Sequence, residues 1–168
     1  MRIHVCPLSK LEATIAETGA RRVITLINSS TVVARPAAIA AGDHLFLGVS
    51  DITEPMDGHI VPAQDHLDRL LDFASGWDRS APLVIHCWAG VSRSTAAAYV
   101  LACALNPARD EEEAAQALRA ASATATPNSR IVALADAHLG REGRMISAIA
   151  AIGRGADCFE GTPFAYAV

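Results

Sequence analysis

A cysteine, a glycine and an arginine lie close together in the segment HCWAGVSRS, residues 86–94. An apolar run, APLVIHC, comes before the turn, and an alanine-rich stretch typical of a helix follows it. The amides of a tight turn and the N-terminus of a helix both attract anions. A thiol in such a setting is stabilised as the thiolate, which is its nucleophilic form. The segment therefore predicts a nucleophile, Cys87, at an anion-binding loop.

Three neighbouring residues suit this loop to a tetrahedral oxyanion. Arg93 offers a planar fork of donors that matches two oxygens, and Gly90 permits a backbone conformation that a Cβ would oppose. Ser94 places a hydroxyl where it can stabilise a departing thiolate. This chemistry is phosphoryl transfer through a cysteinyl-phosphate. The predicted phosphate-binding loop consists of Trp88, Ala89, Gly90, Val91, Ser92 and Arg93.

The strands that must position this loop follow from the hydrophobic pattern. Short apolar or alternating runs predict strands at 2–6, 21–29, 43–51 and 81–87. Strands and helices alternate in the first half of the chain, and helices dominate the second. This order predicts an α/β fold, a three-layer sandwich in which helices flank a central sheet of four or five strands.

Helices are expected at 9–20, 62–77, 93–105, 109–122, 128–139 and 142–152. Ser9 and Glu12 have the spacing of a capping box at the first of these. We expect residues 1–168 to form one domain. Its tail, about 153–168, contains glycines and a proline and should be irregular, packing on the body through Phe159, Phe164 and Tyr166.

Composition excludes several classes of function. A net charge of −4 and a pI near 5.8 argue against a nucleic-acid-binding protein, and no basic run offers a membrane-surface patch. No apolar stretch is long enough for a membrane span, and MRIHVCPLSK lacks the features of a secretory signal. Scattered cysteines without metal-ligand spacing predict a reducing cytoplasm. The histidines form no plausible metal set, so we expect no metal, and we expect no cofactor. The cysteines outside the loop, expected to be small hydrophobes, are Cys6, Cys103 and Cys158.

The segment HCWAGVSRS resembles the His-Cys-x5-Arg-Ser/Thr signature of the protein tyrosine phosphatase superfamily. The matching positions are His86, Cys87, Gly90, Arg93 and Ser94. The mid-chain place of the signature, the short chain and the lack of a Lys-Asn-Arg-Tyr motif favour the compact, dual-specificity-like form. The resemblance implies catalysis by Cys87 and Arg93, and it gives His86 the role of holding the environment of the cysteine.

The resemblance also implies a general acid on a loop after the strand that precedes the signature strand. Asp51, in LGVSDITEP, has that place. Asp57 is the main competitor and Glu54 a third candidate. A carboxyl group there would protonate the leaving oxygen and later activate water.

A second similarity lies downstream, where ATPNSRIVALAD resembles the family's PNxGFxxQL segment. Pro127 and Asn128 match it, whereas Arg130 and Ile131 replace the usual Gly-Phe. The resemblance implies that Asn128 supports the phosphate-binding loop. Asn128 also suits the N-cap of the helix expected at 128–139.

These residues predict a cysteine-dependent phosphatase for phosphotyrosine, with phosphoserine and phosphothreonine as a wider specificity. Its partner would be a phosphorylated protein or a small phosphate monoester, and the oligomeric state stays open. The variable loop positions carry no lysine, which disfavours polyanionic inositol phosphates and lipids. The alternatives are a phospho-residue-binding module without a working acid, a phosphatase for a non-protein ester and a rhodanese-type sulfurtransferase. Trp88 either stacks on an aryl phosphate or packs away from the pocket as an anchor.

Overall fold

A five-stranded sheet lies at the centre of the computed structural model, which describes residues 2–168. The strand order is β3-β2-β4-β1-β5. Strands β1 to β4 are parallel, and β5 runs antiparallel to β1. The bounds are β1 Arg2–Pro7, β2 Arg22–Ile27, β3 His44–Gly48, β4 Leu83–Cys87 and β5 Phe164–Ala167. The carboxyl ends of the parallel strands therefore meet at one edge of the sheet, where ligands bind in such folds.

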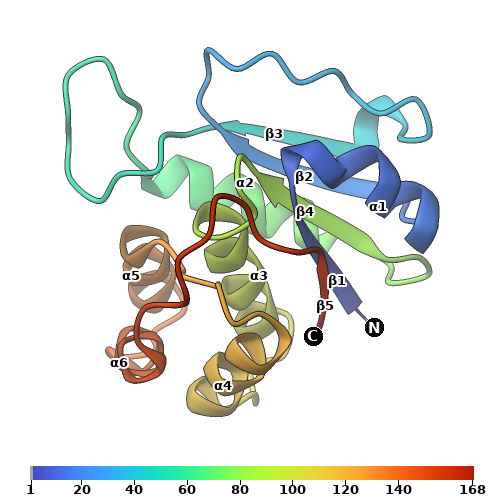
Figure 1. Cartoon of the computed structure of the whole chain (residues 1–168). Helices are drawn as coiled ribbons and strands as arrows, with labels where there is room; N and C mark the ends of the chain where they lie inside the picture. Colours follow the sequence, from blue (N-terminus) through green and yellow to red (C-terminus); the bar gives the residue numbers. More distant parts are fainter. Residues whose placement is uncertain (1) are drawn as a thin grey trace.

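Helices cover both faces of this sheet (Figure 1). Helix α1, Leu11–Thr18, packs on one face with its Leu11 and Ile15. Helices α2 Gln64–Ser75, α3 Arg93–Ala104 and α4 Glu111–Ala121 pack on the other face, and α5 Ser129–His138 and α6 Arg144–Ile152 pack on these helices. The predicted three-layer α/β sandwich is confirmed.

Strand β4 and helix α3 form the middle of the fold. Every residue of β4 is buried, as expected of a strand covered on both faces. Eleven of the twelve residues of α3 are also buried. Its alanines let the helix lie close to the sheet, so the loop between the two elements has a rigid support at each end.

Three sequence predictions at the ends of the chain are wrong, one at the first helix and two in the tail. The first helix begins at Leu11, after a 3-10 turn at Leu8–Lys10, and no side chain caps it. Ser9 instead donates a hydrogen bond to Glu160 of the tail, 2.8 Å away. A partner from a distant part of the sequence has replaced the local capping box.

The tail is not wholly irregular, because residues 164–167 form β5 on the edge of β1. Pairing there satisfies backbone groups of β1 that an open edge would leave exposed. Tyr166 is buried and donates a hydrogen bond to the Ala114 carbonyl (2.7 Å), as an anchor should. Phe164 is partly buried, but Phe159 is 91% exposed, so the prediction that it anchors the tail is wrong.

Candidate active site

The loop from β4 to α3 bends at Gly90, whose φ is 70°. A Cβ at this position would lie 2.6 Å from the backbone nitrogen of Pro7 and 2.7 Å from the carbonyl carbon of Cys6. Both the left-handed backbone and the close approach to β1 therefore require glycine.

Backbone carbonyl groups of this loop accept hydrogen bonds from other parts of the chain. Chain segments on three sides donate to them: Leu8 N to Trp88 O (3.1 Å), Gly161 N to Ala89 O (2.8 Å), Thr126 N to Val91 O (2.9 Å) and Asn128 N to Ser92 O (3.3 Å). Within residues 2–168 no protein acceptor is paired with the N–H groups of residues 88–93. The loop thus has its carbonyls occupied and its amides free, the arrangement of an anion-binding nest.

Cys87 ends β4 and begins this loop. It is 2% exposed, and its Sγ lies 3.1 Å from Ser94 Oγ in the first turn of α3. A serine hydroxyl is the stronger donor of the two, so Ser94 can donate to an ionised sulfur. The structure brings the predicted pair together.

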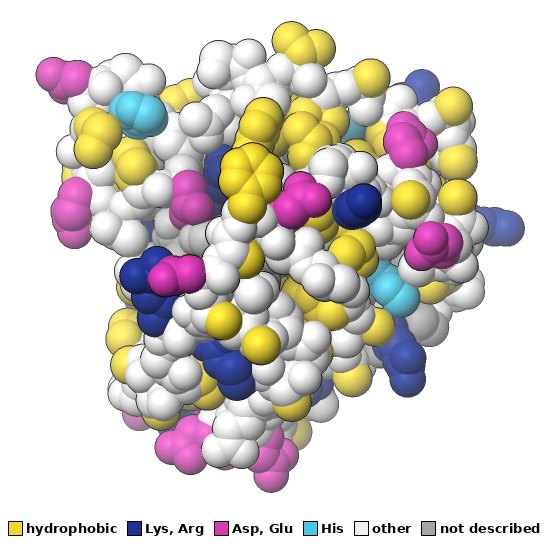
Figure 2. Space-filling view, in the orientation of Figure 1, with side chains coloured by type: hydrophobic (Ala, Val, Ile, Leu, Met, Phe, Trp, Pro, Cys, Tyr) yellow, Lys and Arg dark blue, Asp and Glu magenta, His cyan; other side chains and the backbone are white. Residues whose placement is uncertain are grey.

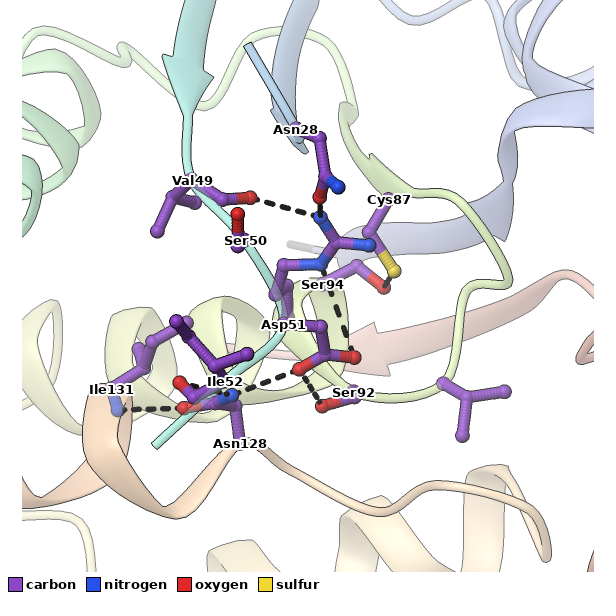
Figure 3. A network of polar contacts seen from close by, with 12 residues as sticks. Asn28, Val49, Ser50, Asp51, Ile52, Cys87, Ser92, Ser94, Asn128 and Ile131 are labelled. Atoms are coloured by element: carbon purple, nitrogen blue, oxygen red, sulfur yellow. Dashed lines mark hydrogen bonds and ion pairs between the residues drawn. The ribbon is translucent and has the colours of Figure 1, made fainter. Parts of the chain in front are cut away.

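Arg93 begins α3 and is 6% exposed. Its Nη1 donates to Asn28 Oδ1 and to the Val49 carbonyl, each at 2.9 Å (Figure 3). These acceptors follow β2 and β3, so the two neighbouring strands hold the guanidinium. Its buried Nε has no hydrogen-bond partner among the described residues. One side of the fork is therefore fixed, and the Nε side is available to a ligand.

Asn28 is a site residue that the sequence interpretation missed. It lies at the end of the strand expected at 21–29, but its contact depends on β2 lying beside β4. Strand order is not visible in the hydrophobic pattern. The signal that could have found it is a polar side chain at the carboxyl end of a buried parallel strand.

Asp51 lies beside the loop (Figure 3). Its Oδ1 accepts hydrogen bonds from Ser92 Oγ (2.7 Å) and Asn128 Nδ2 (2.8 Å). Its Oδ2 is 4.0 Å from Arg93 Nε, and the side chain is 38% exposed. A loop residue, a helix cap and the buried arginine thus converge on one carboxyl group.

The competing carboxylates are not part of this cluster. Asp57 and Glu54 are exposed, and in the described part of the chain neither accepts a side-chain hydrogen bond or forms an ion pair. Asp57 lies in a surface turn closed by a hydrogen bond from His59 N to Met56 O. Of the three predicted acids, the geometry favours Asp51.

Asn128 is the expected N-cap, and its backbone N–H reaches the loop at the Ser92 carbonyl (3.3 Å). As the N-cap of α5, its Oδ1 accepts from the backbone N–H groups of Arg130 (3.1 Å) and Ile131 (3.2 Å), while its Nδ2 contacts Asp51. Arg130 donates to the carbonyls of Pro62 (2.6 Å) and Thr53 (3.1 Å). It joins α5 to the segment that carries Asp51.

His86 is fully buried behind Cys87. Its Nε2 lies 2.7 Å from Thr25 Oγ1, and its Nδ1 lies 3.4 Å from the Cys87 carbonyl oxygen. Burial lowers the pKa of His86 to about 4, so the ring is neutral near pH 7. Trp88 is 57% exposed and does not anchor the loop by packing into the core.

The remaining cysteines differ in exposure. Cys6 and Cys103 are buried, and desolvation raises the pKa of each thiol to about 11. Cys158 is exposed, so the expectation of a buried small hydrophobe is wrong there. Within residues 2–168 no cluster of histidine, cysteine or carboxylate side chains is arranged to hold a metal ion. No helix in the same range is long and apolar enough to cross a membrane.

Comparison with known proteins identifies the fold. No protein-family model matches the chain, and no curated protein matches its sequence. Among solved structures, Cydia pomonella PTP-2 phosphatase is similar at a TM-score of 0.64 and 23% identity, over 80% of this chain and 84% of that one. Human DUSP28 has a TM-score of 0.64 at 15% identity, over 83% of this chain and 92% of that one. DUSP15 has a TM-score of 0.61 at 15% identity, over 89% of each chain. The chain has the fold of the compact dual-specificity and tyrosine phosphatases.

Proposed function

We propose that residues 1–168 form one phosphatase domain that hydrolyses phosphotyrosine monoesters through a cysteinyl-phosphate on Cys87. The observation that carries the proposal is the loop of residues 88–93, whose carbonyls are held from outside and whose amides are unpaired around Cys87 and Arg93. Such a loop matches a tetrahedral dianion. Phosphoserine and phosphothreonine are the wider specificity that fits the same chemistry.

In the first step the Cys87 thiolate attacks phosphorus. The S–P bond forms as the ester O–P bond breaks, and Asp51 gives its proton to the leaving oxygen. Two donors occupy Oδ1 of Asp51, so the transferred proton belongs on Oδ2. The loop amides and Arg93 stabilise the charge on the phosphoryl oxygens.

In the second step water attacks the cysteinyl-phosphate. Asp51 takes a proton from the water, the S–P bond breaks, and inorganic phosphate forms with the thiolate restored. The Ser94 hydroxyl donates a hydrogen bond to the departing sulfur, from which its oxygen is 3.1 Å away, and so stabilises the thiolate. Neutral His86 holds the Cys87 backbone through its Nδ1.

The position of Asp51 favours an enzyme over a binding module. A module that only holds phosphorylated residues needs the loop and Arg93 but no acid beside them. Here Asp51 is bound by Ser92 of the loop itself, at 2.7 Å. A small phosphate ester remains the alternative substrate to a phosphorylated protein, and the cytoplasmic location stays a prediction from the sequence.

The test is hydrolysis of two aryl phosphates, one with a good and one with a poor leaving group. We expect Cys87→Ser to abolish turnover of both. Asp51→Asn should slow the poor leaving group by about 10²- to 10⁴-fold and the good one much less, because only the poor one needs a proton. Asp57→Asn is the matched control and should keep full activity.

Retained turnover in Cys87→Ser, or a larger loss in Asp57→Asn than in Asp51→Asn, would contradict the mechanism. A wild-type chain that binds a phosphotyrosine peptide without hydrolysing it would support the binding module instead. Turnover of a small ester combined with none of phosphopeptides would assign the non-protein substrate.

A further inference from the structure

A chain of three polar side chains crosses the sheet behind Cys87. Thr25 of β2 stands between two histidines: its Oγ1 lies 2.7 Å from His86 Nε2 and 2.8 Å from His44 Nε2. Thr25 and His86 are neighbours in the β2–β4 register, and both are fully buried. His44 begins β3 at the sheet edge and is partly buried. The proposed mechanism uses His86 but gives Thr25 and His44 no role.

The hydrogen positions in this chain follow from counting donors. The Cys87 carbonyl can only accept, so His86 Nδ1 carries the hydrogen of that contact. Because the buried ring is neutral near pH 7, His86 Nε2 is bare and accepts from the Thr25 hydroxyl. A hydroxyl has one hydrogen, so Thr25 Oγ1 must accept from His44 Nε2.

We propose that His44 is a positioning residue for Cys87, which acts through Thr25 and His86. The His44 N–H orients the Thr25 hydroxyl, and the hydroxyl fixes the tautomer and the ring orientation of His86. His86 in turn holds the backbone of the nucleophile. The effect on turnover rests on the proposed phosphatase function, whereas the effect on the His86 tautomer does not.

The contrary reading is that the three groups merely satisfy one another in the interior, where unpaired polar groups are costly. The two hypotheses make different demands on residue 44. A satisfied cluster needs some partner at each position, whereas positioning needs a donor, specifically, at residue 44. Glutamine at position 44 can supply an N–H near the place of Nε2, and leucine cannot.

The first measurement is ¹⁵N NMR of the His86 ring, which reports the tautomer without any catalysis. We expect wild type and His44→Gln to show Nδ1–H with a bare Nε2. In His44→Leu the released hydroxyl can turn away, so the other tautomer of His86 should become populated. His4→Leu, which removes a partly buried histidine of β1 that does not contact Thr25, is the matched control and should keep the wild-type pattern. An unchanged His86 tautomer in His44→Leu would overturn the proposal.

The second measurement is the rate of Cys87 alkylation, taken in a Cys158→Ser background because Cys158 is exposed. We expect His44→Leu to slow alkylation about 3- to 10-fold and His44→Gln to restore it. kcat/KM on an aryl phosphate should fall in parallel. Thr25→Val should show the same loss, and Thr25→Ser should retain most of the rate because it keeps the hydroxyl.

A double-mutant cycle separates positioning from a general loss of packing. If His44 acts through Thr25, the double variant His44→Leu/Thr25→Val should be no slower than Thr25→Val alone. Additive losses would overturn the proposal. If wild type lacks phosphatase activity while the tautomer and the alkylation rate respond as described, the proposed function fails and this inference stands.

Discussion

At the scale of single residues, the partners of Arg93 decide what its charge can do. The guanidinium is almost fully buried, yet the two groups that accept from it, Asn28 and the Val49 carbonyl, are neutral. The nearest carboxylate, Asp51, is 4.0 Å from Nε. Neutral acceptors fix the orientation of the side chain without neutralising it, so the positive charge remains for the phosphate dianion.

Asn28 should therefore control affinity for phosphate. Asn28→Ala leaves Arg93 with one of its two acceptors, and we expect the Ki of inorganic phosphate to rise about tenfold, the equivalent of one hydrogen bond to a charged group. Asn28→Asp should weaken binding as well, because its carboxylate would compete with the ligand. Asn106→Ala, on the surface before α4, is the control. An unchanged Ki in both Asn28 variants would show that the Val49 carbonyl alone positions Arg93.

His86 should also make the fold sensitive to acid. Burial holds its pKa at about 4 against a usual value of 6.5, so the unfolded chain takes up this proton first as the pH falls. The free energy of unfolding should therefore decrease from pH 6.5 downward, by up to about 3 kcal/mol once pH 4 is passed. His4 and His44, whose pKa values burial also lowers, contribute in the same direction.

Chemical denaturation at several pH values measures this slope. The contribution of His86 is the difference between the protein and His86→Gln, which has no group to titrate at that position. Parallel stability curves for the two proteins between pH 6.5 and 4 would show that His86 is protonated in the folded state.

At the scale of elements, the loop depends on segments far from it in sequence. The turn before α1 and the tail each donate to one of its carbonyls, and the segment before α5 donates to two. Strand β1 supports it from below, where Gly90 approaches Pro7 and Cys6. The anion site is therefore a property of the packed elements more than of the signature alone.

Replacing Gly90 by alanine should separate backbone strain from collision. Gly90→Ala faces both a φ of 70° and contacts of 2.6 to 2.7 Å with β1. Gly140→Ala has a similar φ of 62° and nothing within 4 Å, so it isolates the strain, about 1 kcal/mol. We expect Gly90→Ala to lose at least 2 kcal/mol more stability than the control, roughly the cost of overpacking, and to lose oxyanion binding. Equal stability losses in a denaturant titration would mean that the loop can move away from β1.

The sequence predicted the elements whose pattern is local. The buried run before Cys87, the amphipathic helices and the N-cap at Asn128 are each defined by neighbouring residues, and the structure has them. Two of the wrong predictions, the cap at Ser9 and the irregular tail, concern residues with distant partners: Ser9 bonds Glu160, and residues 164–167 pair with β1. Asn28 was missed because it reaches Arg93 only through the strand order. Phe159 and Cys158 were expected to pack but are exposed. Register and strand order arise from packing, so periodicity could not supply them.

At the scale of the whole molecule, the chain is acidic while its site is built for a dianion. The net charge is −4, and Figure 2 shows acidic and basic side chains interspersed on the face in view. Phosphate is therefore attracted by nearby groups and not by the net charge of the molecule. These groups are the loop amides, Arg93 and the N-terminus of α3. Arg93 is buried, and the loop amides have no acceptor among the described residues. Holding these groups in place therefore lowers the free energy of unfolding of the free protein.

An oxyanion that fits the loop should therefore raise the free energy of unfolding. Inorganic phosphate at about 100 times its Kd should stabilise the fold by about 2.7 kcal/mol, which for a chain of this size is a rise in Tm of about 5 to 10 °C. Chloride at equal ionic strength should raise Tm very little, because a spherical ion cannot bind the fork of Arg93 and several amides at the same time. Arg93→Met should remove most of the phosphate effect, while Arg109→Met, far along the chain before α4, should keep it. Equal shifts from phosphate and chloride, or an undiminished shift in Arg93→Met, would mean that the loop of residues 88–93 does not hold the anion.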